Sequence, residues 1–213
     1  MDWQKWHDRY DDPSSWVARR LVAVDARIRA VLDSSPPGPL RVVSLCAGQG
    51  RDLLGVLVDH PRRDDVRARL VELDPRNTAA AQEFARAAGL DQVEVVTGDA
   101  SLVDHYSDLA PADLVLICGV FGNIRDADIE RTVEACTSLC ATGGTVVWTR
   151  NRLAPDRVPQ ICDWFESRGF ERLWLSDAKE TYGVGAHRFG GVQQPLTVGA
   201  QMFTFVGYDV LRK

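Results

Sequence analysis

The segment 42–53, VVSLCAGQGRDL, most constrains what this chain can fold into. An apolar, β-branched run ends in small residues and two glycines, and a second apolar run follows at once. This pattern predicts a buried strand, a tight turn and the first turns of a helix. Gly48 and Gly50 allow backbone conformations that other residues avoid, and they bring main-chain N–H groups and the positive end of the helix dipole up to a ligand. We therefore predict a ligand site at this turn.

Leu53 narrows the identity of that ligand. Folds that bind dinucleotides share the strand and the glycine turn, but they place a small residue three positions after the second glycine so that helix and strand pack closely. Leucine occupies this position here. The sequence therefore favours a ligand without a pyrophosphate over a nicotinamide or flavin dinucleotide, and an NAD(P)-dependent oxidoreductase remains the alternative.

Composition and charge set the broad class. A chain of 213 residues with 45% hydrophobic content suits one domain, with helices over 1–33 and a core over 41–208. The net charge of −5 contains no long run of one sign, which argues against nucleic acid and membrane partners. Neither a signal peptide nor an apolar run of about twenty residues is present. Five cysteines without a Cys-x-x-Cys pair, and scattered histidines, predict a cytoplasmic protein with no metal site.

Acids stand at the carboxyl ends of the next two predicted strands, 68–74 and 93–97. Asp74, followed by Pro75 at the start of a helix, is the first choice to accept hydrogen bonds from two ribose hydroxyls. Glu72 is the second choice, because its side chain points the same way along the strand. A role as helix N-cap competes with ribose binding for Asp74.

The third and fourth strands add further groups to the same edge. Asp99, followed by Ala100, could accept a hydrogen bond from an exocyclic amino group such as that of adenine. After the fourth strand, 112–118, three residues could touch cofactor or substrate, namely Gly119, Phe121 and Asn123. Because the carboxyl ends of parallel strands meet at one edge, these features predict one site there.

The N-terminal segment supplies further candidate residues. Aromatic and polar side chains at helical spacing form either a docking face or a lid, namely Trp3, Trp6, His7 and Tyr10. Ser14 or Ser15 then caps a second helix that runs to about Leu32.

Arg150 stands at the tip of the fifth strand. Two last strands, 172–175 and 201–206, are predicted with a long polar and glycine-rich loop between them. This loop holds His187 and Arg188, and a long loop inside a compact domain is often functional.

From about residue 42 to 206 the chain resembles the class I S-adenosylmethionine-dependent methyltransferases. The resemblance rests on four motifs, 45–52, 73–75, 98–100 and 113–120. It implies a Rossmann-like, doubly wound α/β sheet of seven strands, mostly parallel with an antiparallel last strand, and N-terminal helices that help to cover the cofactor. The implied cofactor is S-adenosyl-L-methionine.

The resemblance also implies a reaction. No Asn/Asp-Pro-Pro-Tyr/Phe motif and no Pro-Cys nucleophile follow the fourth strand, so with the acidic charge a small-molecule acceptor is expected. In-line displacement at an activated methyl group mainly requires alignment of an O, N or C nucleophile and exclusion of water. Bacterial specialised metabolism is the setting that the resemblance suggests. A protein that binds the cofactor without catalysis is the other alternative.

These expectations assign individual roles. The residues expected at the cofactor are Ala47, Gly48, Gly50, Asp74, Pro75, Asp99, Ala100, Gly119, Phe121 and Tyr10. The residues expected at the substrate are Asn123, Arg150 and His7. His187 is the candidate general base and Arg188 the candidate partner of an anionic substrate group, although a lone histidine is commonly solvated or structural.

Overall fold

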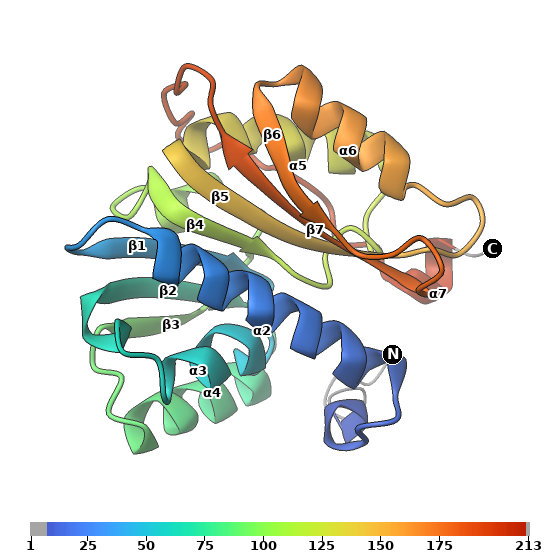
Figure 1. Ribbon diagram of the computed structural model, residues 1–213. Coiled ribbons are helices and arrows are strands. Elements are labelled where there is room, and N and C mark those ends of the chain that lie inside the picture. Colours follow the sequence, from blue (N-terminus) through green and yellow to red (C-terminus); the bar gives the residue numbers. More distant parts are fainter. Residues whose placement is uncertain (1–7, 212–213) are drawn as a thin grey trace.

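Seven apolar runs form one mixed sheet in the computed structural model, which describes residues 8–211 (Figure 1). The strands are β1 (Leu40–Leu45), β2 (Val66–Glu72), β3 (Val93–Thr97), β4 (Ala112–Ile117), β5 (Cys140–Asn151), β6 (Phe170–Leu175) and β7 (Tyr182–Phe189). Their order is β3-β2-β1-β4-β5-β7-β6. Only β7 runs antiparallel to its neighbours, β5 and β6. The predicted doubly wound, seven-stranded sheet with an antiparallel last strand is therefore confirmed.

Helices cover both faces of the sheet (Figure 1). They are η1 (Asp8–Asp11), α2 (Trp16–Ser34), α3 (Arg51–Leu57), η2 (Arg63–Asp65), α4 (Pro75–Ala87), η3 (Val103–Tyr106), α5 (Asp126–Leu139), α6 (Val158–Ser167) and α7 (Tyr208–Leu211). Helices α2, α3 and α4 share a hydrophobic cluster with one face, and α5 and α6 share another with the opposite face. None of the helices in the described part is long and apolar enough to cross a membrane.

Alternation along each strand divides the core between these two clusters. Val42 packs on the side of α2, and its neighbour Val43 packs on the side of α5 and α6. Val147 and Trp148 of β5 divide in the same way. All four side chains are fully buried, as expected for central strands covered on both faces.

Ser15 starts the predicted second helix. Its side chain accepts a hydrogen bond from the N–H of Ala18 at 3.0 Å, which satisfies one of the unpaired donors of the first turn. Apolar residues at helical spacing then pack α2 onto the sheet, namely Val24, Ile28 and Leu32.

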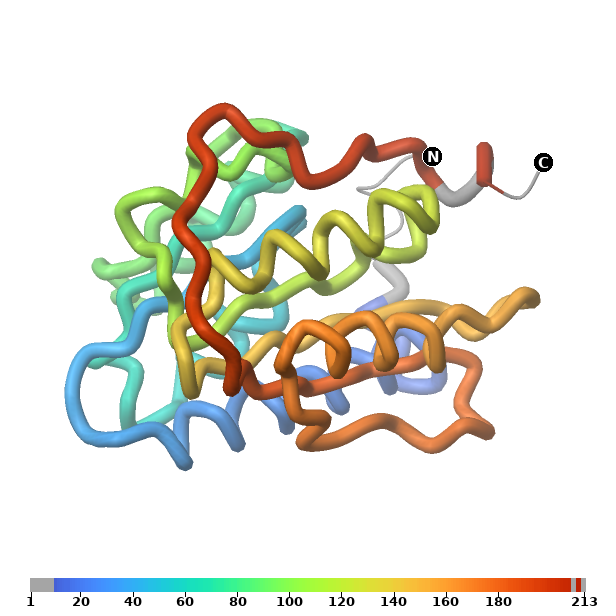
Figure 2. Tube along the Cα trace, turned by 90° about the horizontal axis from the view of Figure 1, so that it is seen from above, coloured from blue at the N-terminus to red at the C-terminus, as the bar shows by residue number. Residues whose placement is uncertain are grey.

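The C-terminal region differs from the expectation. Residues 182–189 form β7, whereas 201–206 is an extended segment with one isolated bridge, from Gln201 to Leu102 (Figure 2). The strand escapes detection because Gly183 and Gly185 resemble loop residues. Both glycines are required by packing, since a Cβ on Gly185 would lie 2.4 Å from the ring of Trp148 and one on Gly183 would lie 2.5 Å from Val158.

The site is positioned by a reversal of strand order. The chain builds β1, β2 and β3 outward on one side and then returns to place β4 beside β1. Crossovers on the two sides diverge at such a point, which leaves a crevice outside the carboxyl ends of the central strands. In Figure 1 these ends lie at the right-hand edge of the sheet.

Candidate functional site

The glycine turn after β1 is built from alternating left-handed residues. Cys46, Gly48 and Gly50 have φ values of 50°, 57° and 67°. A Cβ on Gly50 would lie 2.7 Å from Leu70 and 2.8 Å from Leu54, so no other residue fits there. Gly50 at the N-cap of α3 has no side chain to cap the first turn, in which Asp52 Oδ1 accepts the N–H of Leu53 at 2.8 Å. The turn therefore presents backbone N–H groups at the edge of the sheet, as the sequence predicts.

Glu72, the last residue of β2, reaches across to this turn. Its Oε2 accepts the N–H of Gly48 at 2.9 Å, and its Oε1 accepts the N–H of Asp74 at 2.9 Å. A carboxylate has about four acceptor positions, so capacity for further donors remains. Two adjacent ribose hydroxyls are donors that this geometry fits.

Asp74 has a different role from the one given as first choice. It is the N-cap of α4, where its Oδ1 accepts the N–H of Arg76 at 2.9 Å, and it forms an ion pair with the same arginine at 2.5 Å. Pro75 is the first residue of that helix and is exposed. Of the two acids, Glu72 is the one that contacts the glycine turn, which favours Glu72 over Asp74 as the acid that binds the ribose.

The tip of β3 lies beside that of β2. The N–H of Gly98 donates to the carbonyl oxygen of Glu72 at 2.9 Å. Asp99 is exposed, with its Oδ1 accepting the N–H of Ser101 at 3.0 Å. Ala100 is 3% exposed and packs in the core, so Asp99 is the side chain of this pair that faces outward.

The loop after β4 carries three of the predicted residues, and one of them, Phe121, turns its side chain into the core. Gly119 has φ of 81°, donates its N–H to Thr149 Oγ1 at 2.8 Å, and accepts a hydrogen bond from Asn123 Nδ2 at 2.7 Å. Phe121 is fully buried, with its ring centroid 6.0 Å from that of Trp148. The ring of Phe121 therefore fills the core below the loop, which leaves only the backbone of this residue for the expected contact with the cofactor.

Arg150, near the end of β5, contacts the loop after β4. Its Nη1 donates to the carbonyl oxygen of Phe121 at 2.6 Å. The structure thus brings Gly119, Asn123 and Arg150 together beside the tips of β4 and β5. The glycine turn, Glu72 and Asp99 gather at the tips of β1, β2 and β3.

The N-terminal segment lies against the glycine turn. Tyr10 accepts a hydrogen bond from Arg20 Nη2 at 3.0 Å, and burial raises the pKa of its hydroxyl. Arg51, which follows Gly50, stacks 5.5 Å from the ring of Tyr10 and pairs with Asp11 at 2.6 Å. The other members of the predicted lid lie outside the described residues, namely Trp3, Trp6 and His7.

Sequence reasoning missed a buried polar group beneath this segment. Asp52, in the first turn of α3, is 9% exposed, and burial raises its pKa. Burial, with Asp52 nearby, also raises the pKa of Asp25 on α2 to about 7. Asp52 could have been found because it directly follows the glycine turn, whereas Asp25 is hidden in an ordinary amphipathic helix.

The two cysteines at this edge are not activated. Burial raises the pKa values of the Cys46 and Cys118 thiols, so both stay protonated at neutral pH. Neither provides a thiolate nucleophile.

The histidine and arginine chosen for catalysis lie elsewhere. His187 is fully buried in the middle of β7, where its Nδ1 accepts the N–H of Trp148 at 3.1 Å and its ring stacks on Phe165 at 4.9 Å. Burial lowers its pKa to about 4. Arg188 is exposed and pairs with Glu171 at 2.5 Å. Both assignments are wrong because they assumed a loop, and the strand carries both residues away from the carboxyl edge.

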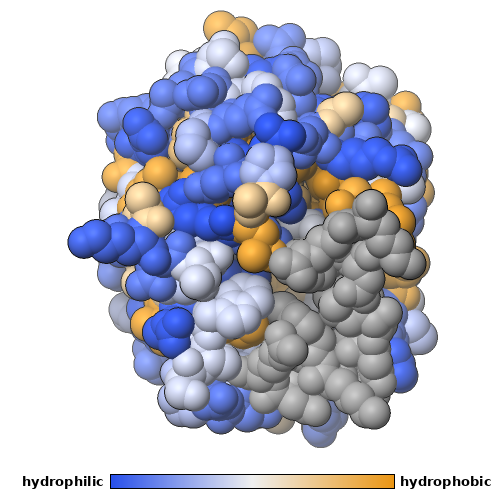
Figure 3. Space-filling view, turned by 90° about the vertical axis from the view of Figure 1, so that its right-hand side faces the viewer, coloured by the Kyte–Doolittle hydropathy of each residue, from blue (hydrophilic) through white to orange (hydrophobic). Residues whose placement is uncertain are grey.

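Figure 3 shows this edge of the sheet, where apolar residues lie among polar ones. Several large apolar side chains in the segments that follow the strands are exposed, namely Leu73, Leu153, Phe205, Val210 and Leu211. Such a mixed surface suits ligands that carry both apolar and polar groups.

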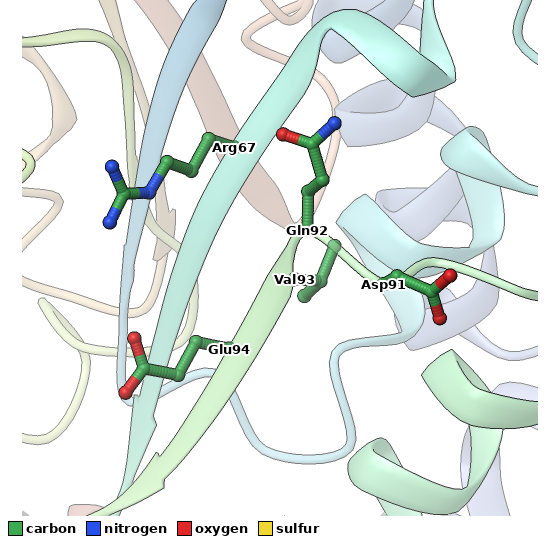
Figure 4. Close-up of a pocket in the computed structure, with 5 residues that line it drawn as sticks. All are labelled: Arg67, Asp91, Gln92, Val93 and Glu94. Carbon is green, nitrogen blue, oxygen red and sulfur yellow. The ribbon is translucent and has the colours of Figure 1, made fainter.

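A separate depression lies at the opposite end of β2 and β3 (Figure 4). Its lining residues are Arg67, Asp91, Gln92, Val93 and Glu94. Asp91 points away from Arg67 and Glu94, so the charged groups do not converge on one point. This depression lacks the features of a ligand site.

Comparisons with known proteins agree with this geometry. Residues 16–162 match the model of a family described as "Putative methyltransferase". No curated protein matches the sequence.

Solved methyltransferases share the fold at low sequence identity. A precorrin-6y C5,15-methyltransferase from Geobacter metallireducens superposes with a TM-score of 0.59 at 14% identity, over 78% of this chain and 87% of that one. A TehB-like SAM-dependent methyltransferase from Corynebacterium glutamicum gives 0.59 at 17% identity, over 87% and 97%. The CurJ carbon methyltransferase gives 0.63 at 17% identity, over 80% and 54%.

The residues at the carboxyl edge of the sheet fit S-adenosylmethionine, the cofactor named for the Corynebacterium glutamicum enzyme. Glu72 offers its carboxylate beside the glycine turn, and Leu53, fully buried in α3, fills the place where a dinucleotide site needs a small residue. Since the family model spans more than half of the sequence, the chain belongs to this methyltransferase family.

Proposed function

We propose that the protein transfers the methyl group of S-adenosylmethionine to a small-molecule acceptor, at an oxygen, nitrogen or carbon atom. The observation that carries this proposal is the division of the carboxyl edge into two groups. Glu72 and the glycine turn fit the adenosine, and Asn123 with Arg150 stands apart, beside the tips of β4 and β5. The net charge of −5 supports a small acceptor over nucleic acid.

The residues of the first group bind and orient the donor. Glu72 accepts hydrogen bonds from the ribose hydroxyls while its existing bond to Gly48 keeps the carboxylate in place. Asp99 accepts from the adenine amino group, and Tyr10 helps to cover the site. Three small residues let the main chain lie close to the donor, namely Ala47, Gly50 and Gly119.

The residues of the second group orient the acceptor. S-adenosylmethionine supplies a methyl group on a positively charged sulfur, so little activation is needed from the protein. Asn123 and Arg150 align the acceptor, and η1 covers the glycine turn and keeps water out of the site. The thiols of Cys46 and Cys118 stay protonated, which favours direct transfer over a covalent enzyme intermediate. His7 remains part of this proposal as a substrate residue.

All five cysteines are free thiols, none of them belongs to a Cys-x-x-Cys motif, and three are buried in the core. This usage supports our proposal that the enzyme works in the reducing cytoplasm.

The test supplies S-adenosylmethionine with a tritiated methyl group to the enzyme, together with phenols, carboxylic acids, amines and a metabolite extract. We expect label in low-molecular-mass products. Arg150→Ala should lower transfer about ten- to a hundredfold while leaving binding of S-adenosylhomocysteine intact, because alignment of the acceptor is lost. Arg188→Ala is the matched control and should transfer normally, since Arg188 pairs with Glu171 on the surface. Label found only in nucleic acid or protein would overturn the small-molecule assignment.

A further inference from the structure

The chain after β7 forms a C-terminal strap, residues 190–207. It crosses α5 and returns to the carboxyl edge of the sheet (Figure 2). The first part is fixed to the end of α5, where the N–H of Gln194 donates to the carbonyl oxygen of Thr137 at 3.0 Å. This path takes the strap along the outside of the helical layer to the site.

The strap then binds the loop after β3, residues 98–106, which carries Asp99. The N–H of Val103 donates to the carbonyl oxygen of Ala200 at 3.1 Å, and the N–H of Met202 donates to that of Ser101 at 2.8 Å. Asp104 Oδ1 accepts the N–H of Gly199 at 2.8 Å. The loop donates one of these hydrogen bonds and the strap donates two, so each segment fixes the position of the other.

Four residues later, the same strap binds the loop after β4. The carbonyl oxygen of Asn123 accepts the N–H groups of Val206 and Gly207 at 2.9 and 3.0 Å. Asp128, in the first turn of α5, accepts the N–H of Thr204 at 3.2 Å. The side chain of Asn123 in turn holds Gly119, at the tip of β4.

The link between the two loops is packed as well as hydrogen-bonded. Met202 and Phe203 are each 1% exposed and belong to the core cluster that contains Ala100 and Val120, one residue from each loop. Burial of two such side chains stabilises the strap against the core. A change in the loop after β3 therefore has a short, stiff route to Asn123.

We propose that the strap couples the adenosine half of the site to the acceptor half, with Asp128 as a positioning residue. This inference rests on the proposed function, because it assumes that the adenosine moiety occupies the loop after β3. Ligand binding there orders the strap at residues 199–202, and the strap orders the loop at residues 119–123 through Thr204, Val206 and Gly207. The acceptor side thus becomes aligned when the donor side is filled.

The test measures amide hydrogen exchange with and without S-adenosylhomocysteine, alongside the affinity for that ligand by calorimetry. In the unchanged protein we expect the ligand to slow exchange both in 98–106 and in 119–124. In Asp128→Ala the ligand should still bind and protect 98–106, but the protection of 119–124 should be lost. Asp128→Asn keeps an acceptor oxygen and should restore it.

Asp126→Ala is the matched control, because Asp126 lies in the same turn of α5 and pairs with Arg157 instead of the strap. It should behave as the unchanged protein. Thr204→Pro removes the same N–H from the strap side and gives an independent variant if Asp128→Ala does not fold.

Two results would overturn the coupling. One is ligand binding without protection of 119–124 in the unchanged protein, and the other is full protection of 119–124 in both Asp128→Ala and Thr204→Pro. Absence of ligand binding to the unchanged protein would instead overturn the proposed cofactor site, and the coupling with it. The two failures are therefore distinguishable.

Discussion

At the scale of single residues, two neighbouring acids differ in the groups that they bind. Glu72 and Asp74 are two residues apart and both acidic, yet one faces the glycine turn and the other caps a helix. The sequence placed both near the site, because an acid at the end of the second strand was expected. It ranks Asp74 first because the predicted strand runs to residue 74, whereas β2 ends at Glu72.

His187 gives a prediction for the dependence of stability on pH. Its folded-state pKa of about 4 lies below the ordinary 6.5, so the unfolded chain binds a proton that the folded protein does not. The stability of the protein should therefore fall as pH falls from about 6.5 toward 4, by up to about 3 kcal/mol from this group. In His187→Gln, which keeps an acceptor for the N–H of Trp148, this contribution should vanish.

The measurement is urea unfolding of both proteins at several pH values between 7 and 4. As pH falls, the unfolding free energy of the unchanged protein should decrease relative to that of His187→Gln. Parallel curves would show that the buried imidazole is not the titrating group.

At the scale of elements, the parallel part of the sheet could be predicted, and the C-terminal part could not. Strands such as β1 and β4 are mostly apolar and a glycine follows each within three residues, which is the pattern of a buried parallel strand. In β7, glycines and a histidine interrupt the pattern. The glycines are needed because Trp148 and Val158 occupy the space that side chains would fill, and such contacts between distant residues leave no local pattern in the sequence.

Gly185→Ala tests that explanation. The new methyl group would overlap the ring of Trp148, so we expect a loss of at least 1–3 kcal/mol in unfolding free energy. The matched control is Gly55→Ala in α3, where nothing lies within 4 Å of the added Cβ. That change should stabilise the protein by up to about 1 kcal/mol, because alanine favours helix over glycine. Chemical unfolding of both variants checks the pair, and equal effects would contradict the packing account.

At the scale of the whole molecule, topology explains why distant residues form one site. The reversal of strand order between β1 and β4 brings the glycine turn, Glu72 and Asp99 to the tips of β1, β2 and β3, and Asn123 and Arg150 to the tips of β4 and β5 at the same edge. The sequence predicted this convergence, because each polar group follows an apolar strand. The C-terminal strap was not predicted, because its hydrogen bonds come mostly from the backbone and leave no pattern of residues.

The account as a whole depends on which ligand the carboxyl edge binds and which acid holds it. The most direct measurement is calorimetric titration of S-adenosylhomocysteine and NADH into the unchanged protein, Glu72→Gln and Asp74→Asn. We predict that S-adenosylhomocysteine binds and NADH does not. Glu72→Gln should weaken binding by roughly tenfold to a hundredfold, through loss of charged hydrogen bonds, and Asp74→Asn should bind nearly as well as the unchanged protein. Binding of NADH alone, or a loss of affinity in Asp74→Asn but not in Glu72→Gln, would contradict the account.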